Sequence, residues 1–406
     1  MKLNIDKIRN DFPILSEKIR GKSLVYFDNG ATSQKPKIVI DRMSDYYLHE
    51  NSNVHRGVHY LSQIATDAME SSRERIRKYL NAESIEEVIF TKGTTEAINL
   101  VASSFGKAFI NKGDEIVVTE MEHHANIVPW QMLCEEKSAV LRVVKIHDDG
   151  SLNMDSLAET LNEKTKLIAI AHISNVMGII NPIKEIIAMA HQKNIAVLID
   201  GAQAVPHMTI DVQDLDCDFY IFSGHKMYAP MGIGILFGKK KYLDAMPPYQ
   251  TGGEMIKKVS FEKTTFNDLP FKFEAGTPMV AEIIGLATAI DYMESIGIEN
   301  IQQYENELLE YATEALLKLD GMRIIGTNTN KASVISFVLE DIHHYDAGSL
   351  LDQMGIAVRT GNHCAQPLMQ CFGLSGTIRA SFAFYNTKEE IDIMVKAIKK
   401  VQMMLS

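Results

Sequence analysis

Two residues with reactive side chains follow neighbouring apolar runs in the middle of the sequence. Asp200 ends the run IAVLID, and Lys226 lies in DFYIFSGHKMYAP, just after the next run. An aspartate at the end of a buried strand keeps its charge only beside a cationic partner, such as a protonated pyridine nitrogen. A lysine whose pKa is lowered by burial and neighbouring cations can form a Schiff base. A helix-capping aspartate and a solvated surface lysine are the alternatives.

A phosphate-binding turn is indicated further upstream, in EEVIFTKGTTEAINLVASSFG. Gly93 forms the turn after a strand, and Thr94 and Thr95 begin the helix that follows. Free backbone N–H groups, two hydroxyls and the positive end of the helix dipole suit a bound phosphate. Threonines that merely cap a helix are the alternative.

Together these residues predict a site for pyridoxal phosphate. A phosphate turn, an aspartate at a strand end and a lysine after the next strand supply one group each for the phosphate, the ring nitrogen and the aldehyde of this cofactor. That order along the chain is typical of fold type I pyridoxal-phosphate enzymes. Further polar groups surround the aspartate and the lysine, namely Gln203, Ser223 and His225.

A pair of histidines, His123 and His124, follows the β-rich run DEIVVT in EMEHHANIVPW. Either would reach the same edge of the sheet, where an imidazole could stack on the cofactor ring and carry protons. A lone histidine in a loop is more often structural, but the residues around this edge favour the functional interpretation.

Cys364 is the predicted nucleophile. It lies in AVRTGNHCAQPLM, between Gly361 and Pro367, beside His363 and downstream of Arg359. Glycine and proline set a defined turn, and cationic neighbours favour the reactive thiolate. A small buried hydrophobic residue is the alternative, which suits Cys134 and Cys217 better. A zinc site made by His363, Cys364 and Cys371 is a poor third interpretation because no second ligand pair is visible, and we expect no metal ligands.

The elements that must position these residues form an α/β fold. Seven short β-rich runs alternate with helical patterns between about residues 86 and 237: EEVIF, DEIVVT, AVLRVVKI, KLIAIAHIS, IAVLID, DFYIF and GIGILF. Runs that are apolar nearly throughout predict a mostly parallel, seven-stranded sheet covered by helices. Ligands bind beyond the carboxyl ends of such strands, which is where the reactive residues occur.

The domain organisation follows from a change of pattern after about residue 288, where a long helix precedes strands mixed with helices. We expect an N-terminal segment, 1–20, that packs on the small domain; a large cofactor-binding domain, 21–287; and a small α/β domain, 288–406, that carries the Cys364 loop. Pro182 is expected at the first position of one helix, and Thr387 with Glu390 forms a capping box before another.

Composition excludes several classes of protein. The 406 residues include 41 Lys and Arg against 52 Asp and Glu, a formal charge of -11, which disfavours nucleic acid as a partner. No apolar stretch resembles a signal peptide or a membrane span, so we expect a cytoplasmic protein. Four cysteines without a C-x-x-C pair indicate reduced thiols rather than a disulfide framework.

Long motifs extend these separate signals over almost the whole chain, from about Asp28 to Asn386. They are FDNGAT, NVHRGVH, FTKGTTEAINLVA, EMEHHANIVPWQ, IDGAQAVPH, FSGHKMYAPMGIGIL, GGEMI, FEAGTP, RTGNHCAQPLM and RASFAFYNT. In these motifs the chain resembles the class V aminotransferase-like cysteine desulfurases, and specifically their Suf-type (group II) branch. The resemblance implies a fold type I pyridoxal-phosphate enzyme that converts L-cysteine to L-alanine. It also implies that sulfane sulfur is held as a persulfide on Cys364 and passed to an acceptor for iron–sulfur cluster assembly.

The resemblance also implies roles for individual residues. Lys226 would form the Schiff base, Asp200 would pair with the pyridine nitrogen, and Gln203 would contact the ring hydroxyl. His123 would stack on the ring and carry protons. The phosphate would be held by Thr94, Thr95, Ser223 and His225, with Thr277 of FEAGTP reaching across the interface of a homodimer. The substrate carboxylate would be held by Asn175 and Arg379, and the pocket near the thiol lined by His55, Arg56 and Arg359.

Two features bear on the resemblance without changing the expected family. Most relatives have His at the position of Asn362, and an amide cannot carry a proton as an imidazole can, so proton traffic near Cys364 would run through His363, His123 or His55. The segment DIHHYD at 341–346 resembles the place where some members meet a zinc-bearing SufU-type sulfur acceptor. Other members with similar histidines use a SufE-type acceptor, so the sequence leaves the partner open.

Two alternative functions stay open. A selenocysteine lyase on the same scaffold would have the Cys364 loop but could dispense with it. A non-catalytic assembly protein would have lost the chemistry, against which the joint presence of Lys226, Asp200, His123 and Cys364 argues.

Overall fold

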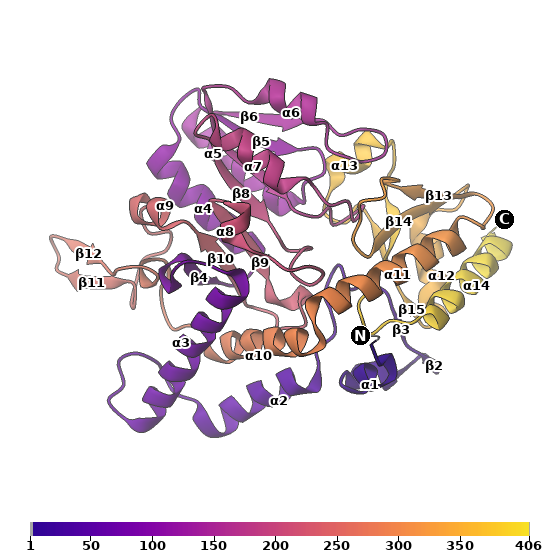
Figure 1. Ribbon diagram of the computed structural model, residues 1–406, viewed down its shortest axis with the longest axis horizontal. Helices are drawn as coiled ribbons and strands as arrows, with labels where there is room; N and C mark the ends of the chain where they lie inside the picture. Colours follow the sequence, from indigo (N-terminus) through magenta and orange to yellow (C-terminus); the bar gives the residue numbers. More distant parts are fainter. Residues whose placement is uncertain (1–2, 406) are drawn as a thin grey trace.

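A seven-stranded sheet forms the centre of the larger unit in the computed structural model, which describes residues 3–405 (Figure 1). The strand order is β4-β10-β9-β8-β7-β5-β6, and only β10 runs antiparallel to its neighbours. The predicted mostly parallel seven-stranded sheet is confirmed, and each predicted run supplies one strand. The strands are β4 Val88–Thr91, β5 Glu115–Thr119, β6 Val140–Val144, β7 Thr165–Ala171, β8 Ala196–Asp200, β9 Phe219–Ser223 and β10 Gly234–Gly238.

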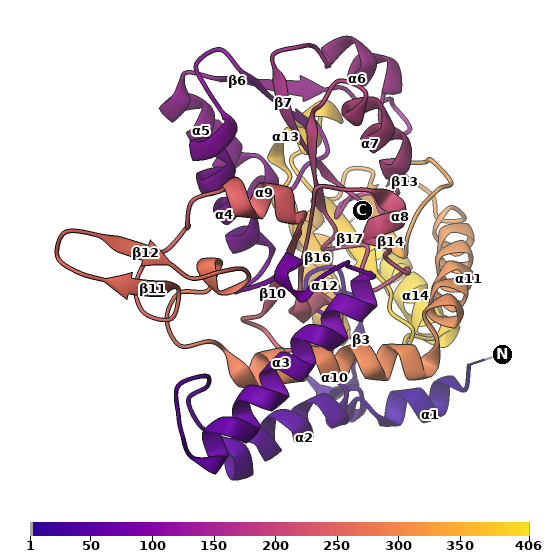
Figure 2. The same cartoon turned by 60° about the vertical axis from the view of Figure 1, so that its left-hand side comes forward.

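Helices cover both faces of this sheet because its inner strands are buried on both sides (Figure 2). Alternate strand residues face opposite ways, so Ile116 and Val118 pack with one group of helices, and Val117 with the other. The first group is α4 Thr94–Phe109, α5 Val128–Lys137 and α9 Lys240–Ala245. The second is α3 Tyr60–Leu80, α7 Ile183–His191, α8 Val212–Leu215 and α10 Val280–Ile296.

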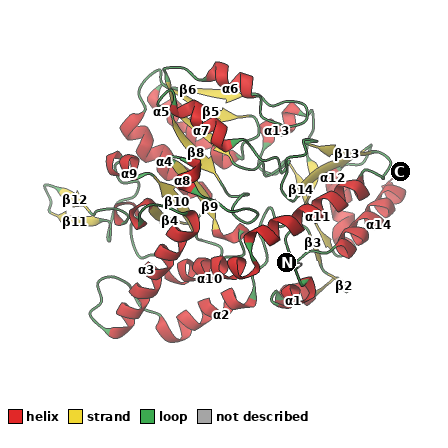
Figure 3. Ribbon diagram, in the orientation of Figure 1, coloured by secondary structure: helices red, strands yellow, loops and turns green. Residues whose placement is uncertain are grey.

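A smaller α/β unit follows, built on a four-stranded antiparallel sheet of order β13-β14-β17-β16 (Figure 3). Its strands are β13 Met322–Ile325, β14 Val334–Leu339, β16 Arg359–Gly361 and β17 Thr377–Ser381. Three helices pack on it: α11 Ile298–Leu316, α12 His344–Gln353 and α14 Lys388–Leu405. Phe337 of β14, Leu351 of α12 and Ile398 of α14 lie in this second core, fully removed from solvent.

The N-terminal segment lies against the smaller unit. Arg9 forms an ion pair with Glu390 of α14 at 2.9 Å, and Arg20 pairs with Asp352 at 2.8 Å. The association continues beyond residue 20, because β3 Val25–Tyr26 pairs in parallel with β15 Ile356–Ala357. The division at 287/288 stays a prediction. It falls inside the continuous helix α10, and the break between α10 and the next helix, α11, is at Gly297.

The remaining elements are short or peripheral. They are α1 Ile5–Asn10, α2 Lys37–Asp45, α6 Met154–Thr160, α13 Gln366–Cys371, β1 Lys18–Ile19, β2 Lys22–Ser23, β11 Ile256–Val259 and β12 Thr264–Phe266. Among the helices of residues 3–405, none has both the length and the apolar character that crossing a membrane requires.

One of the two predicted helix starts is confirmed and one is displaced. Thr387 N–H donates to the Glu390 carboxylate and Glu390 N–H donates to Thr387 Oγ1, the reciprocal bonds of a capping box. Pro182, expected at the first helical position, is instead the cap before Ile183. Its ψ of 65° is not helical, because the chain makes a tight turn there in which Ile183 N–H bonds to the Asn181 carbonyl.

Candidate active site

A cavity of about 510 Å³ lies at the carboxyl edge of the large sheet, facing the smaller unit. Strands β4, β5, β7, β8 and β9 are parallel to one another, so the loops after them meet at this edge. The structure brings most of the predicted residues together in the wall of this one cavity. They are Thr94, Thr95, His123, Asn175, Asp200, Gln203, Ser223, His225, Lys226, Arg359, Cys364 and Arg379.

The predicted phosphate-binding turn is a close contact between two strand ends. Ser223 Oγ, at the end of β9, accepts from Thr94 N–H at 2.8 Å and lies 2.9 Å from Thr94 Oγ1. Gly93 has a φ of 150°, and a Cβ on Gly234 of β10 would lie 2.4 Å from the Gly93 Cα. The backbone can approach this closely only with glycine at residue 234. The N-terminus of α4 therefore faces the cavity with hydroxyls on two sides.

The aspartate is buried, and the lysine is half-buried in the wall of the cavity. Burial lowers the pKa of Lys226 to about 8, and the charge of Arg379 lowers it as well, while Asp200 and Cys364 raise it. Burial raises the pKa of Asp200, and Lys226 opposes that rise. Within residues 3–405 the Asp200 carboxylate accepts one hydrogen bond, from Ala202 N–H at 3.0 Å. A cationic group in the cavity would hold this carboxylate ionised.

The peptide before Lys226 is held by a segment that sequence reasoning did not single out. The His225 carbonyl accepts from Ser33 N–H at 3.1 Å, Thr32 Oγ1 at 3.0 Å and Lys35 Nζ at 2.8 Å. Burial lowers the pKa of Lys35 to about 7. These donors fix the turn that projects Lys226 into the cavity.

His123 and His124 contact different parts of the site. His123 lines the cavity, and its pKa is lowered to about 4, first by burial and then by the charges of Lys226, His124 and Arg379. His124 reaches the cysteine loop instead, where its backbone N–H donates to the Cys364 carbonyl at 2.7 Å and its Nε2 accepts from Gln366 N–H at 2.9 Å. The histidine pair therefore connects the cofactor side of the cavity to the nucleophile side.

A buried network beneath the histidines fixes their backbone. Glu122 accepts from Thr119 Oγ1 at 2.6 Å and from Asn126 Nδ2 at 2.7 Å, and Asn126 accepts from Trp130 Nε1 at 3.0 Å. Burial raises the pKa of Glu122 to about 7. In the sequence, this network could have been inferred from Glu122, the acidic residue directly before the two histidines in EMEHH.

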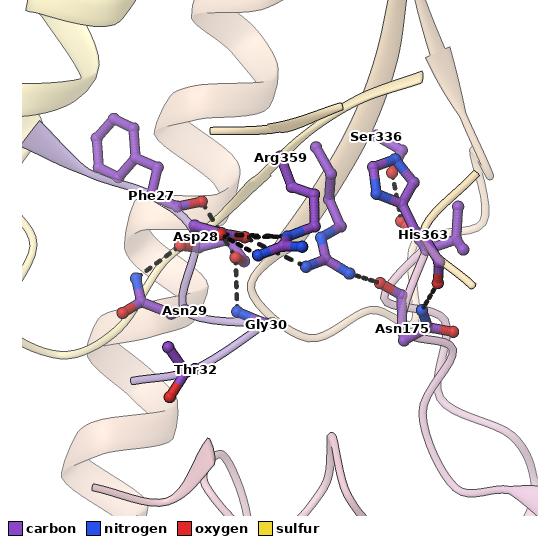
Figure 4. Close-up of polar contacts among 12 residues, drawn as sticks. Phe27, Asp28, Asn29, Gly30, Thr32, Asn175, Ser336, Arg359 and His363 are labelled. Carbon is purple, nitrogen blue, oxygen red and sulfur yellow. Dashed lines mark hydrogen bonds and ion pairs between the residues drawn. The ribbon is translucent and has the colours of Figure 1, made fainter. Parts of the chain in front are cut away.

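Two arginines of the smaller unit line the cavity, and both bind the same carboxylate, that of Asp28 (Figure 4). Asp28 accepts from Arg359 Nη2 at 2.8 Å and from Arg379 Nη2 at 3.4 Å. Arg379 Nη1 also donates to the Asn175 carbonyl at 2.8 Å, and Asn175 Nδ2 donates to the His363 carbonyl at 2.7 Å. Arg379 Nε is buried without a partner in the described part of the chain. Two guanidinium groups beside an amide make this end of the cavity suitable for a carboxylate.

Three predicted residues lie outside the cavity. His55 and Thr277 line a separate cavity of about 240 Å³, where His55 Nε2 lies 3.1 Å from Glu70. Arg56 pairs with Glu254 at 3.2 Å. In the single chain, therefore, neither His55 nor Arg56 lines the cavity that contains Cys364, and their role near the thiol stays a prediction. Thr277 was expected to act across a dimer interface, and that role stays a prediction.

The comparisons with known proteins agree with this geometry. Residues 25–394 match the family model described as Aminotransferase class-V. A cysteine desulfurase from Synechococcus elongatus is 52% identical over 98% of this chain, and the chain spans 64% of that relative's length. A cysteine desulfurase from Pectobacterium carotovorum is 49% identical, with 100% of both chains covered. The solved cysteine desulfurase CsdA from Escherichia coli has a TM-score of 0.93 at 38% identity and covers 100% of both chains.

An α/β fold with a half-buried lysine and a buried aspartate at the carboxyl edge of its sheet defines the class of scaffold. The chain belongs to the class V aminotransferase family, among relatives that are cysteine desulfurases. Membership of this family implies pyridoxal phosphate as the cofactor. The residues fit that group, since one cavity of sufficient size is lined by hydroxyls and a helix N-terminus, a buried carboxylate and a half-buried amine.

Proposed function

We propose that this protein is a cysteine desulfurase that takes sulfur from L-cysteine onto Cys364, leaving L-alanine. The observation that carries the proposal is the shared cavity of Lys226 and Cys364, in which the thiolate charge of Cys364 favours the ammonium form of Lys226 and so raises its pKa. A half-buried amine with a lowered pKa and a thiol in the same cavity are the two groups that this reaction needs. The cysteine desulfurases found among its relatives support the same assignment.

In this proposal the chain would hold pyridoxal phosphate by three groups. The N-terminus of α4 with Thr94, Thr95, Ser223 and His225 would bind the phosphate, Asp200 would hold a proton on the ring nitrogen, and Lys226 would bind the aldehyde carbon. Gln203, which donates to the Gly30 carbonyl at 2.8 Å, would contact the ring hydroxyl. When bound, the cofactor supplies an electron sink for carbanion chemistry at the substrate.

The substrate would enter with its carboxylate toward Arg379 and Asn175. Arg379 is buried, and burial lowers its pKa, so an incoming carboxylate replaces lost solvation. Arg359 lies nearer to solvent, with its side chain 48% exposed, and is held by Asp28. This arrangement orients the substrate thiol toward Cys364 on the neighbouring turn.

Two proton carriers serve the reaction. With a pKa of about 8, Lys226 is partly unprotonated at neutral pH and can take the Cα proton of the substrate. His123 stays neutral at the same pH because its pKa is about 4, so its imidazole can pass protons without adding charge to the cavity. His363, whose pKa burial lowers to about 3, is also neutral.

The sulfur transfer is a displacement at sulfur. The Cys364 thiolate attacks the substrate sulfur, an S–S bond forms, and the Cβ–S bond of the substrate breaks. The electron pair of the broken bond stays with Cβ, which is then protonated as alanine forms. Cys364 carries the sulfane sulfur as a persulfide, which passes to an acceptor protein for iron–sulfur cluster assembly.

We further propose the Suf-type branch, a homodimer and a cytoplasmic location. Thr277 and the TGGEM segment would complete the neighbouring subunit's site, an isologous arrangement. His343 and His344 of the segment 341–346 lie at the start of α12, in the same smaller unit as Cys364. The acceptor protein could be of the SufU type or of the SufE type.

The test is alanine formation from L-cysteine by the parent protein, Cys364→Ala and the matched control Cys371→Ala. Cys371 is also an exposed free thiol, at the end of α13. Cys364→Ala should form almost no alanine, and Cys371→Ala should match the parent. Parental alanine formation by Cys364→Ala would replace this proposal with a lyase, the alternative in which selenocysteine is the substrate and the thiol is a bystander.

A further inference from the structure

Cys364 lies in a turn with an unusual backbone. His363 and Cys364 both have left-handed φ angles, 52° and 56°, and Ala365 N–H donates to the Asn362 carbonyl at 2.9 Å. Those features describe a type I′ turn, whose central positions normally hold glycine, asparagine or aspartate. A histidine and a cysteine there cost conformational energy, so the surroundings must hold the turn.

Asn362 holds the turn from within. Its Oδ1 accepts from Cys364 N–H at 3.0 Å, in addition to the bond that its carbonyl makes with Ala365 N–H. The turn's carbonyls have partners from the larger unit, since His363 O accepts from Asn175 and Cys364 O accepts from His124. Among the described residues, only Asn362 accepts from the Cys364 amide, whose nitrogen is bonded to the Cα from which the thiol side chain extends.

Two histidines of this chain make the same cap with an imidazole. His123 Nδ1 accepts from Ala125 N–H at 3.0 Å, and His343 Nδ1 accepts from Tyr345 N–H at 3.3 Å, each two residues ahead. An imidazole nitrogen accepts only while it is unprotonated, whereas an amide oxygen accepts at every ordinary pH. The cap at Asn362 therefore does not titrate.

We propose that Asn362 is the positioning residue for sulfur transfer, and that its uncharged cap holds Cys364 in its left-handed conformation independently of pH. The inference rests on the proposed function, because it assigns the purpose of the turn to the attack of the thiolate on substrate sulfur. A displacement at sulfur needs the nucleophile in line with the bond that breaks, and misplacement by about 1 Å can cost about a hundredfold in rate.

Other groups around the turn titrate or carry charge, and any pH profile includes them. The smaller unit contributes Arg359, Arg379, His363 and His344, and the larger unit contributes Asp28, His123, His124 and Lys226. These groups are common to the parent and to every variant at residue 362. Comparing variants at one position therefore isolates the cap.

The experiment measures the cap directly as well as through turnover. Selective labelling with 15N-cysteine gives four backbone amide signals, because the chain has four cysteines, and Cys364→Ala assigns the one of interest. Exchange of that amide with water is compared in the parent, Asn362→Ala, Asn362→Asp and Asn362→His, at pH 6 and pH 8. Alanine formation is measured in parallel. The Cys134, Cys217 and Cys371 signals report whether each variant is folded.

We expect Asn362→Ala to speed exchange of the Cys364 amide by about tenfold or more, and to slow alanine formation by roughly ten- to a hundredfold. Asn362→Asp, which keeps an acceptor oxygen, should keep the amide protected. Asn362→His should match the parent's protection at pH 8 and lose it at pH 6, where an ordinary histidine is about three-quarters protonated. Its ratio of alanine formation at pH 6 to that at pH 8 should then fall below the parent's ratio.

Unchanged exchange or unchanged turnover in Asn362→Ala would overturn the inference, as would a parental pH ratio in Asn362→His. If Asn362→Ala does not fold, the comparison of Asn362→Asp with Asn362→His decides, since both retain an acceptor and only one titrates. Failure of the proposed function looks different. Cys364→Ala would then form alanine at the parental rate, while the exchange results could still stand.

Discussion

The fraction of Lys226 that is unprotonated follows from its burial. With a pKa lowered to about 8, about one Lys226 in ten is a free amine at pH 7, against about three in ten thousand for a lysine of ordinary pKa 10.5. Lowering the pKa therefore increases the fraction of Lys226 that is a free, nucleophilic amine by roughly 300-fold. This larger fraction favours Schiff-base formation. Asp200 works in the opposite direction because its charge favours the ammonium form.

The assay is reductive methylation of cofactor-free protein at pH 6 to 11, with the Lys226 peptide quantified by mass spectrometry. The methylation rate of Lys226 should rise to half its maximum near pH 8. In Asp200→Asn the midpoint should fall by about one pH unit or more, since an opposite charge within a few ångströms shifts a pKa by about 1–3. Lys240 is the internal control, because its bond to Glu86 raises the pKa of an exposed amine.

A Lys226 midpoint near 10.5 would refute the argument that burial prepares this amine. A normal response of Lys240 would show that the reagent and the pH series were sound. A low Lys226 midpoint that did not move in Asp200→Asn would support the effect of burial on the Lys226 pKa. It would contradict the claim that the charge of Asp200 raises that pKa.

Three further outcomes are expected. Purified protein should be yellow, and borohydride should fix the cofactor on Lys226, because a C=N bond is reducible; reducible covalent cofactor in Lys226→Ala would contradict the assignment. Asp28→Asn should raise the KM for L-cysteine about tenfold or more, because both active-site arginines lose their shared carboxylate, whereas Asp352→Asn, which removes the exposed ion pair with Arg20, should not. Light scattering should show a homodimer, and a fully active monomer would exclude a shared site at Thr277.

The architecture was largely predictable because the sheet is buried on both faces. Continuous apolar runs mark such strands, and in a parallel sheet the residues just after them converge by topology alone. That rule was enough to predict that Thr94, His123, Asp200 and Lys226 meet at one edge, although their distances depend on packing. The start of α7 was displaced by one residue because a local turn at Pro182 competed with the helix.

The nucleophile side of the cavity was less predictable. Asp28 and Arg359 are separated by 331 residues and meet only when the smaller unit folds against the stretch of the larger unit that follows β3. The left-handed angles of His363 and Cys364 also have little sequence signal, because cysteine does not favour them and histidine adopts them in only a small fraction of cases. His55 and Arg56 were placed near the thiol by resemblance, and within one chain their own ion pairs hold them elsewhere.

The most direct test of the central claim is the mass of the Cys364 peptide after one turnover of cofactor-loaded protein with L-cysteine and no acceptor. The division of labour between Lys226 and Cys364 predicts one added sulfur atom on Cys364, one alanine released for each sulfur bound, and no added sulfur on Cys371. In Cys364→Ala the substrate should still change the visible spectrum of the bound cofactor, without alanine or persulfide. Stoichiometric alanine from the parent with an unmodified Cys364 would contradict the account.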